Sequence, residues 1–371
     1  MSEKHLALHQ QHLALGGRMV PFAGFIMPIQ YTSIIEEHLA VRENVGIFDV
    51  SHMGEFEFRG ADAESFLNRM TTNNVAKLEV GQVQYSAMLY DDGGVVDDLL
   101  VYRLADRFMT VVNAANIQKD WEWLKSHLSD GFGDPSYAKA DVQMTDISDD
   151  ITLLAIQGPR AAELVRQIAG VATDDIVYYH YREGKVGGVP AIISRTGYTG
   201  EDGFELYVKR ADSVKLWDAI WAAGKPLNLK PVGLGCRDSL RLEACYCLYG
   251  NDIDATTNPM EAGLGWIVKA KKPGGFIGLE PVLKAKDGTG RQLAGFTLDD
   301  KSIARHGAEI YRDGVKIGVV TSGGYSPVLD KPVGMGYINK PHNEIGAKIQ
   351  IDMRGRMLAA RVAPTPFYKR V

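Results

Sequence analysis

The feature that most limits the fold of this 371-residue chain is a segment rich in glycine, proline and lysine at residues 271–291. Its Pro273-Gly274-Gly275 run and residues 287–290 break regular structure, so we predict a linker there. Beyond it, short apolar runs alternate with turn signals, as in residues 316–322 and 347–353, which is typical of strands. Because 371 residues exceed what one core usually supports, several domains are predicted, the last an all-β barrel or jelly-roll-like sandwich.

Ahead of this linker, helix and strand patterns are mixed. Apolar residues recur at helical spacing after Asn116, at Ile117, Trp121, Leu124 and Leu128, which predicts a helix. Extended runs at residues 152–156 and 189–195 predict strands. This mixture indicates the α+β class for the larger part of the chain.

The overall charge narrows the classes of function. Lysine and arginine number 41 against 46 acidic residues, a net charge of −5, which argues against a nucleic-acid-binding surface. Residues 1–17 lack an apolar core long enough for a signal peptide, and no run approaches a membrane span of about 18 apolar residues. We therefore expect a cytoplasmic protein with no membrane association.

Cysteine and histidine spacing argues against a metal site. The cysteines are Cys236, Cys245 and Cys247, so a C-x-C pair is present but no C-x-x-C pair. We interpret them as reduced thiols of a cytoplasm-like compartment. Residues 3–15 are predicted to form a helix with His5, His9 and His12 on one face, and a solvated amphipathic helix is favoured over a metal site there.

The first candidate for chemistry is an acidic pair in a predicted hairpin. Residues 84–90 and 95–104 have strand patterns, and 91–94 have turn chemistry. Adjacent residues of a strand point to opposite faces, so Asp97 and Asp98 are not expected to cooperate. Asp98 would share its face with Val96, Leu100 and Tyr102, where burial raises the pKa of a carboxyl. The pattern leaves open acid–base or amine-binding work for Asp98, or structural bonds to loop amides.

The second candidate is the glycine-rich stretch RTGYTGEDGFELYV at residues 195–208. A dinucleotide-binding fingerprint must open a helix, whereas alternation after Gly203 predicts a strand. A tight hairpin therefore remains, and a carboxylate such as Glu205 on it suits a ring edge with adjacent N–H donors. A purely structural hairpin with exposed acids is an equal alternative.

The third candidate is the stretch GLGCRDSLRLEACYCLYGNDID, residues 233–254, whose first half is predicted to be helical. Arg237 and Arg241 lie one helical turn apart and suit a clamp for a carboxylate. Pairing with Asp238 or Glu243 is the alternative, since surface pairing is the usual fate of such charges.

A hydrolase is disfavoured. Asp49, Ser51 and His52 stand close together, but adjacent serine and histidine side chains on a strand point apart. The chain also lacks a G-x-S-x-G stretch to present a nucleophile.

Nine segments along the chain, from about Arg18 to the C-terminus, resemble those of the glycine cleavage system T-protein family. In order they are FAGFIMPIQY, FDVSHMGE, GGVVDDLLVY, VVNAAN, LLAIQGP, SRTGYTGEDGFE, GLGCRDSLRLEA, LYGNDID and TSGGYSP. Each segment is short, but nine in the same order make a chance similarity implausible.

The resemblance implies a three-domain cloverleaf around a central hole that holds tetrahydrofolate. Residues 1–50 with 138–275 would form a discontinuous α+β folate-binding domain, 51–137 an α+β domain carrying Asp98, and 276–371 the C-terminal β-barrel domain. The implied reaction is that of an aminomethyltransferase. It takes the one-carbon unit from the S-aminomethyldihydrolipoyl-lysine of the lipoylated H-protein and gives 5,10-methylenetetrahydrofolate, ammonia and the dihydrolipoyl H-protein, without metal or flavin.

The same resemblance assigns site residues by position. Asp98 matches the catalytic aspartate beside the reacting folate nitrogens. Glu205 matches the acid that binds the pterin ring, and Arg237 the arginine on the folate side. Further residues match positions lining the cavity or its tail contact: Tyr85, Asn113, Tyr178, Tyr198 and Arg370. The family usually carries alanine where Cys236 stands, a small difference.

Two alternatives share the scaffold. One is a folate-dependent demethylase of another small molecule, although fused flavin-containing relatives carry a G-x-G-x-x-G unit that the N-terminus lacks here. The other is a non-catalytic folate-binding protein for iron–sulfur cluster maintenance. Its K-G-C-Y-x-G-Q-E stretch is not found, and the nearest text, beginning at Cys245, differs.

Overall fold

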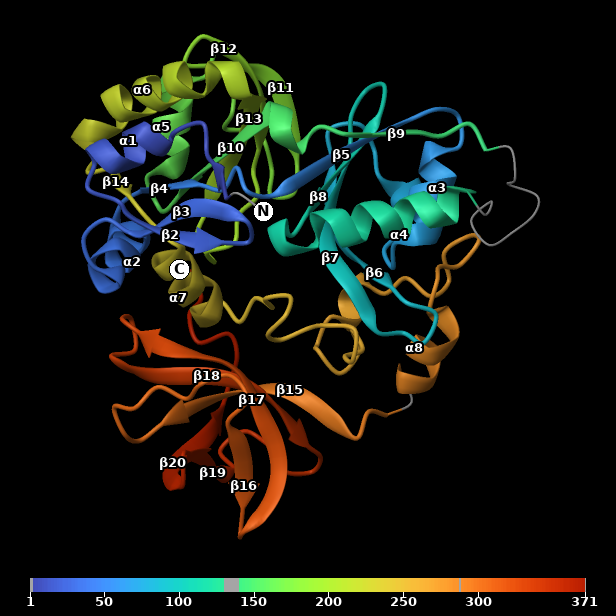
Figure 1. Ribbon diagram of the computed structural model, residues 1–371, viewed down its shortest axis with the longest axis vertical. Helices are drawn as coiled ribbons and strands as arrows, with labels where there is room; N and C mark the ends of the chain where they lie inside the picture. The colour runs from blue at the N-terminus through green and yellow to red at the C-terminus, as the bar shows by residue number, and fades with distance from the viewer. Residues whose placement is uncertain (1–2, 130–139, 287, 371) are drawn as a thin grey trace.

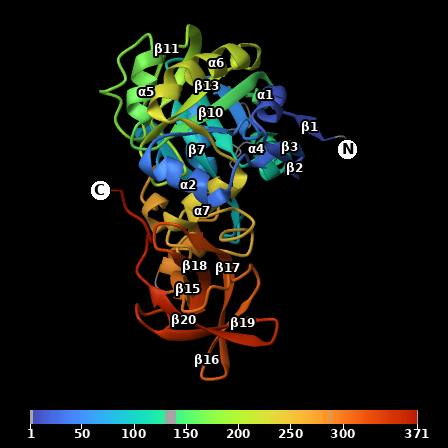
Figure 2. The same ribbon diagram turned by 90° about the vertical axis from the view of Figure 1, so that its left-hand side faces the viewer.

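The computed structural model describes residues 3–129, 140–286 and 288–370. In Figure 1, two lobes of mixed helix and strand lie side by side above a lobe built of strands, and α7 (Leu234–Glu243) lies between them. Figure 2 shows the strand lobe at the far end of the long axis. The predicted class, α+β with a C-terminal barrel, is confirmed.

The first lobe is a sheet covered on both faces. Its strand order is β11-β12-β13-β10-β4-β14. The strands are β4 (Gly46–Asp49), β10 (Ile151–Gln157), β11 (Tyr181–Val186), β12 (Val189–Ser194), β13 (Gly203–Lys209) and β14 (Lys230–Pro231). Helices α5 (Ala161–Ile168) and α6 (Ser213–Gly224) bury their apolar stripes on one face, whereas α2 (Ile34–Glu43) and α7 pack on the other. Because side chains alternate along the strands, each face of the sheet forms its own apolar core with the helices that cover it. The side of α7 that does not pack on the sheet faces the other lobes.

The N-terminal segment differs from its prediction. Residues 3–15 were predicted to form one helix, but the chain forms β1 (Lys4–His5) and a short α1 (His9–Ala14), followed by β2 (Arg18–Phe22) and β3 (Phe25–Gln30). His12 is fully buried, with Nε2 2.9 Å from Asp49 Oδ2 and Nδ1 2.8 Å from Tyr31 Oη. The solvated histidine face is therefore wrong, because β1 pairs with β3 and turns this segment onto the first lobe.

The second lobe is a sheet of order β6-β7-β8-β5-β9. Its strands are β5 (Gly54–Arg59), β6 (Val83–Leu89), β7 (Val95–Arg103), β8 (Phe108–Val112) and β9 (Gln143–Asp146), and α3 (Ala63–Met70) and α4 (Ile117–Ser129) pack against it. The predicted hairpin is confirmed as β6–β7. The proposed domain boundary at 137 lies outside the described residues. Because β9 pairs with β5, this sheet extends to Asp146.

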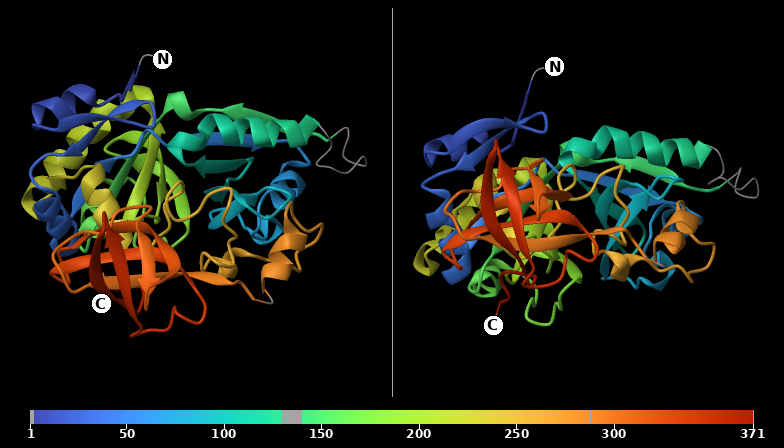
Figure 3. Two further views of the ribbon diagram at one scale, coloured as in Figure 1. Left: turned by 60° about the horizontal axis from the view of Figure 1, so that its bottom comes forward. Right: turned by 90° about the horizontal axis from the view of Figure 1, so that it is seen from below.

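The predicted linker contains a helix. It contains α8 (Leu279–Lys286), and Phe276 and Val282 join a core with Leu89 and Val95 of the β6–β7 hairpin. The prediction of a bare linker is therefore wrong, because its apolar residues cover one end of the second lobe. Figure 3 shows the preceding yellow-to-orange stretch running from α7 toward α8.

Lys272 anchors this stretch. Its side chain is buried, and Nζ donates hydrogen bonds to the carbonyl oxygens of Asn68 in the last turn of α3 and of Thr71 and Asn73 just after it. Carbonyls at a helix C-terminus lack helical partners, so an ammonium group there satisfies them. Lys271, its neighbour, is exposed.

We expect Lys272→Met to lower Tm by about 5 °C or more, because buried carbonyls lose their donor. Lys271→Met is the matched control and should leave Tm within about 1 °C, since exposed positions change stability little. Thermal unfolding followed by circular dichroism checks both variants. Equal Tm values for the two would contradict the anchoring role.

The third lobe is a closed barrel in the order β15-β18-β17-β16-β19-β20. Its strands are β15 (Arg291–Leu298), β16 (Glu309–Arg312), β17 (Val315–Ser326), β18 (Lys331–Asn339), β19 (Lys348–Met353) and β20 (Arg356–Ala363). Inward side chains form one apolar core. Polar bonds connect it to α7, where Arg241 donates to Ser322 Oγ at 2.9 Å and Ser326 donates to Glu243.

Candidate active site

A cavity of about 990 Å³ lies where α7, the two sheets and the segment after α7 meet. Of the eight site residues predicted from the sequence, the structure places seven on its lining: Asp98, Glu205, Arg237, Tyr85, Asn113, Tyr178 and Tyr198. The eighth, Arg370, is not among the lining residues. The volume falls within the usual range of about 300–1,000 Å³ for small-molecule sites.

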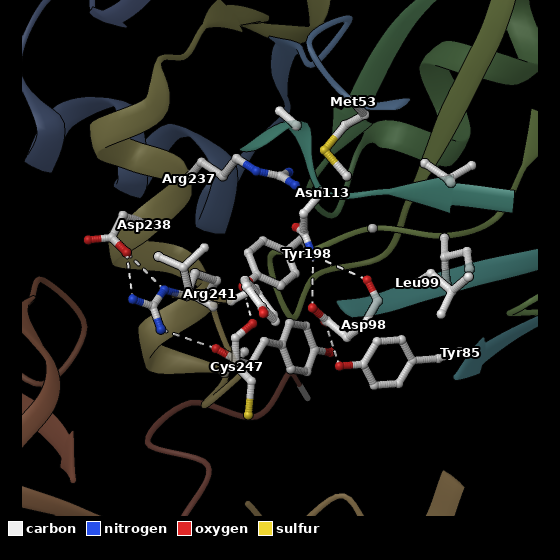
Figure 4. A pocket seen from close by; sticks show the side chains of 18 of the residues that line it. Met53, Tyr85, Asp98, Leu99, Asn113, Tyr198, Arg237, Asp238, Arg241 and Cys247 are labelled. Carbon is white, nitrogen blue, oxygen red and sulfur yellow. Dashed lines mark hydrogen bonds and ion pairs between the residues drawn. The ribbon is translucent and has the colours of Figure 1, made fainter. Parts of the chain in front are cut away.

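Asp98 lies on β7 and is held by two donors. Tyr85 Oη donates to Oδ2 at 2.7 Å, and Asn113 Nδ2 donates to Oδ1 at 2.8 Å (Figure 4). Tyr85 comes from β6 and Asn113 follows β8, so the strands on either side of β7 orient this carboxyl. Burial, and next the charge of Asp97, raise the pKa of Asp98 to about 7, although both hydrogen bonds act in the opposite direction.

Asp97 lies away from the cavity that Asp98 lines, as strand alternation predicted, but a hydrogen-bonded side chain connects the two. Asn113 Nδ2 donates to Asp97 Oδ1 as well, at 2.8 Å, so one amide bridges the two carboxyls. Asn113 N and Asn116 Nδ2 also donate to Asp97, at 3.0 and 2.6 Å. The two carboxyls thus lie on different sides of the strand, since only Asp98 lines the cavity, but the residue at the end of the neighbouring strand links them, which strand alternation did not predict.

A β-bulge changes one predicted neighbour of Asp98. Met88 pairs with Asp97 but Leu89 pairs with Val95, so the register shifts between them. Val96 consequently packs in the lobe core with Leu99 and Val101 rather than beside Asp98. Leu100, as predicted, lines the cavity with Asp98.

Glu205 lies on β13 opposite Ser194 of β12, so the predicted strand-turn-strand hairpin is confirmed. Its side chain is buried on the cavity wall, and Thr196 Oγ1 donates to Oε2. Burial raises the pKa of Glu205, whereas the Thr196 bond and the nearby Arg237 charge lower it. No donor to Oε1 exists among the described residues, which leaves this oxygen for a ligand.

The two arginines of α7 have different partners. Arg241 is fully engaged, with Asp252 at 2.7 Å and Asp238 at 2.8 Å. Arg237 has no ion pair within the described parts of the chain, and its guanidinium lies 4.6 Å from the ring centroid of Tyr198. Burial lowers the pKa of Arg237. Of the two alternatives, pairing with Asp238 holds for Arg241, and Arg237 is the cation left for the cavity.

The remaining predicted residues lie at the wall and outside it. Tyr198 Oη donates to the carbonyl oxygen of Cys247, and Tyr178 is 43% exposed on the lining. Arg370 Nη1 lies 3.5 Å from Asp202 Oδ1, and its guanidinium is 6.0 Å from the Tyr178 ring. Arg370 thus pairs with an acid rather than facing the cavity.

His52 is a cavity residue that pattern did not select. It is 3% exposed, and its Nδ1 has no partner among the described residues. Burial, and next the charge of Arg237, lower its pKa to about 3, so the ring is neutral. Ser51 Oγ instead donates to Asp49, which pairs with His12, so no hydrolase triad forms at these positions. The one sequence signal for burial of His52 is its spacing: it lies two residues after Val50, which is in the core, and alternate residues of a strand share a face.

Within the described ranges, no group of three or more histidine, cysteine, aspartate or glutamate side chains is arranged to hold a metal ion. In those same ranges, no helix has the length and apolar character to cross a membrane.

Comparison with known proteins decides the family. Residues 8–272 match the GCVT N-terminal domain, and residues 291–369 match the glycine cleavage T-protein C-terminal barrel domain. The chain belongs to the glycine cleavage T-protein family. The T-protein resemblance drawn from the nine segments is thereby confirmed.

Relatives in this T-protein family match the chain over nearly its whole length. An aminomethyltransferase of Chloroherpeton thalassium is 49% identical over 98% of each chain, and one of Bacteroides fragilis is 47% identical over 97% of this chain and 98% of the relative. The crystal structure of glycine cleavage system aminomethyltransferase T from Bartonella henselae has a TM-score of 0.89, with 35% identity and 99% of both chains covered. The predicted enzyme class, an aminomethyltransferase of the glycine cleavage system, is confirmed.

Proposed function

We propose that the cavity binds tetrahydrofolate and receives the aminomethyl group from the lipoyl arm of the H-protein, releasing ammonia and dihydrolipoyl H-protein. The observation that carries this proposal is the buried Asp98 carboxyl, oriented by Tyr85 and Asn113 on the wall of a large cavity. Tetrahydrofolate supplies the nitrogens that accept the one-carbon unit.

The cavity chemistry supports a folate. Glu205 Oε1 is an acceptor without a donor in the described part of the chain, which suits the adjacent N–H groups of a pterin edge. Arg237 is a cation without an ion pair in those same residues and suits an electron-rich or anionic part of the ligand. Tyr178 and Tyr198 supply aromatic wall for the apolar middle.

We assign Asp98 the work of orienting the folate nitrogen and stabilising the positive charge that develops as the sulfur and then ammonia depart. A carboxylate fixed by two donors needs no reorganisation during the reaction, which is where preorganised charge is most effective. Tyr85 and Asn113 are the residues that hold it. Arg370 is left out of the proposed folate contacts, because it pairs with Asp202.

A cytoplasmic location belongs to the same proposal. Cys236, Cys245 and Cys247 are all free thiols, which suits a reducing compartment.

The deciding experiment mixes the purified chain with aminomethylated H-protein and tetrahydrofolate and follows ammonia and methylene-tetrahydrofolate. We expect both products in equal amounts, well above the rate without enzyme. Ammonia release at the uncatalysed rate would overturn the proposed function. A parallel reaction with unlipoylated H-protein is the control and should give no product.

A further inference from the structure

A third carboxyl group lies behind Asp98, on the side away from the cavity. Asp120 on α4 is fully buried, and its side chain contacts that of Asp97. Neither of its oxygens accepts a hydrogen bond from any described residue. Asp97, in contrast, accepts from Asn113 N, Asn113 Nδ2 and Asn116 Nδ2.

This asymmetry decides where a proton resides. A fully buried carboxylate without a donor is costly by several kcal/mol, and two ionised carboxyls in contact also repel each other. A proton on Asp120 removes both penalties, since a carboxylic acid has an O–H that can donate to Asp97. The three amide donors then stabilise the charge that stays on Asp97.

One nearby cation opposes a proton on Asp120, but burial outweighs it. Lys119 Nζ forms a long ion pair with Asp120 Oδ1 at 4.0 Å. Burial and the charge of Asp97 raise the pKa of Asp120, whereas Lys119 lowers it. Lys119 donates its hydrogen bond to Val96 O and not to Asp120, and lies 4.0 Å from the Tyr249 ring centroid. The other titratable groups that face the pair are Tyr90, Tyr249 and Asp98. Those that face Asp98 itself are Tyr85, Tyr179, Tyr198 and Cys247.

We propose that Asp97 and Asp120 share one proton, so that a single negative charge is fixed behind Asp98 and coupled to it through the bridging Asn113 amide. The inference rests on the proposed role of Asp98. Asp97 and Asp120 touch neither substrate nor cavity and act as positioning residues. Burial raises the pKa of Asp120 to about 11 and that of Asp98 to about 7. Burial also raises the pKa of Asp97, but the hydrogen bonds from Asp120, Asn113 and Asn116 act in the opposite direction.

The single charge has a consequence for Asp98. A second charge on the pair would raise the pKa of Asp98 further and favour its neutral form, whereas a neutral pair would lower that pKa, although burial would still act to raise it. One charge leaves Asp98 close to the protonation balance at which a carboxyl can both hold a cation and exchange a proton.

Infrared spectroscopy tests the shared proton without catalysis. The spectra are compared at a pH above 7, where Asp98 is ionised. The wild-type spectrum minus that of Asp120→Asn should contain the carbonyl stretch of a protonated carboxyl, because the variant lacks this group. Glu122→Gln removes an exposed acid of the same helix and should show no such band. Absence of the band from the Asp120→Asn difference would overturn the proposal.

The pH profile of kcat/KM tests the coupling. Asp120→Asn replaces the protonated acid by an uncharged amide that still donates to Asp97, so this variant should leave the midpoint unchanged. Asp97→Asn removes the fixed charge and should lower the midpoint by about 1 unit or more, at least tenfold in proton affinity. A lowered midpoint in Asp120→Asn would show that Asp120 is ionised and overturn the proposal.

These outcomes separate the inference from the proposed function. A wild-type chain that makes no methylene-tetrahydrofolate contradicts the function, while the infrared band is measured without substrate. Asp120→Asn distinguishes the two charge states by itself, so the test stands even if Asp97→Asn does not fold.

Discussion

Asp98→Asn is expected to lower kcat by about 10²–10³-fold, the range seen when one preorganised electrostatic group is removed. The amide keeps the shape and an acceptor for Tyr85, but it carries no charge to stabilise the cation that forms as the sulfur and then ammonia depart. The Kd of tetrahydrofolate should change little, because the interaction is needed mainly in the transition state. Single-turnover kinetics and a folate titration measure the two effects separately.

The pH dependence of the wild type follows from the same group. With a pKa of about 7, Asp98 is mostly protonated and neutral below pH 7 and ionised above it. Because the proposed role of Asp98 requires the ionised carboxylate, kcat/KM should rise with pH through a midpoint near 7. Asp98→Asn should abolish this step. Asp91→Asn, an exposed acid in the turn of the same hairpin, is the control and should keep both rate and profile.

Equal losses in Asp98→Asn and Asp91→Asn would contradict the assignment of Asp98. A profile without a step near pH 7 would show that the carboxyl does not titrate in the working range.

Glu205→Gln is expected to weaken tetrahydrofolate binding by about 10–100-fold, equivalent to roughly 1.5–3 kcal/mol for a hydrogen bond to a charged group. The substituted amide removes the negative charge and turns one acceptor into a donor against the N–H edge of the ring. The hydroxyl of Thr196 donates to Glu205, so in the variant the amide oxygen has to face Thr196. The NH₂ group then points toward the ligand. Isothermal titration measures Kd directly.

Glu183→Gln on β11 of the same sheet is the matched control, because Glu183 is exposed and lies outside the cavity lining. Its Kd should equal that of the wild type. Unchanged binding by Glu205→Gln would remove Glu205 from the folate site. A lowered kcat with unchanged Kd would instead place its effect in the transition state.

Local patterns predicted the elements that carry the candidate site. Alternation before and after the turn at residues 91–94 identified the β6–β7 hairpin, and alternation after Gly203 identified β13. Both signals are local because side chains of a strand repeat every two residues. The barrel strands were recognised for the same reason.

Long-range contacts were not predictable in this way. Arg237 and Arg241 look equivalent in the sequence, but Arg241 pairs with Asp238 of its own helix and with Asp252 from a later loop, while Arg237 has no ion pair among the described residues. Lys272 looked like a solvated linker lysine until the end of α3 supplied its carbonyl partners.

The sequence by itself determined the class of the chain, the strands that present Asp98 and Glu205, and, through its ordered segments, the family. These depend on short-range periodicity and on residue identity. The tertiary structure alone decided that Asp97 and Asp98 share the Asn113 amide and that Asp120 lies against them. The physical reason is that the protonation of a buried acid depends on the donors and charges around it. Here they come from Asn113 and Asn116 after β8 and from Asp120 on α4, and strand and helix periodicity do not show that these side chains meet at β7.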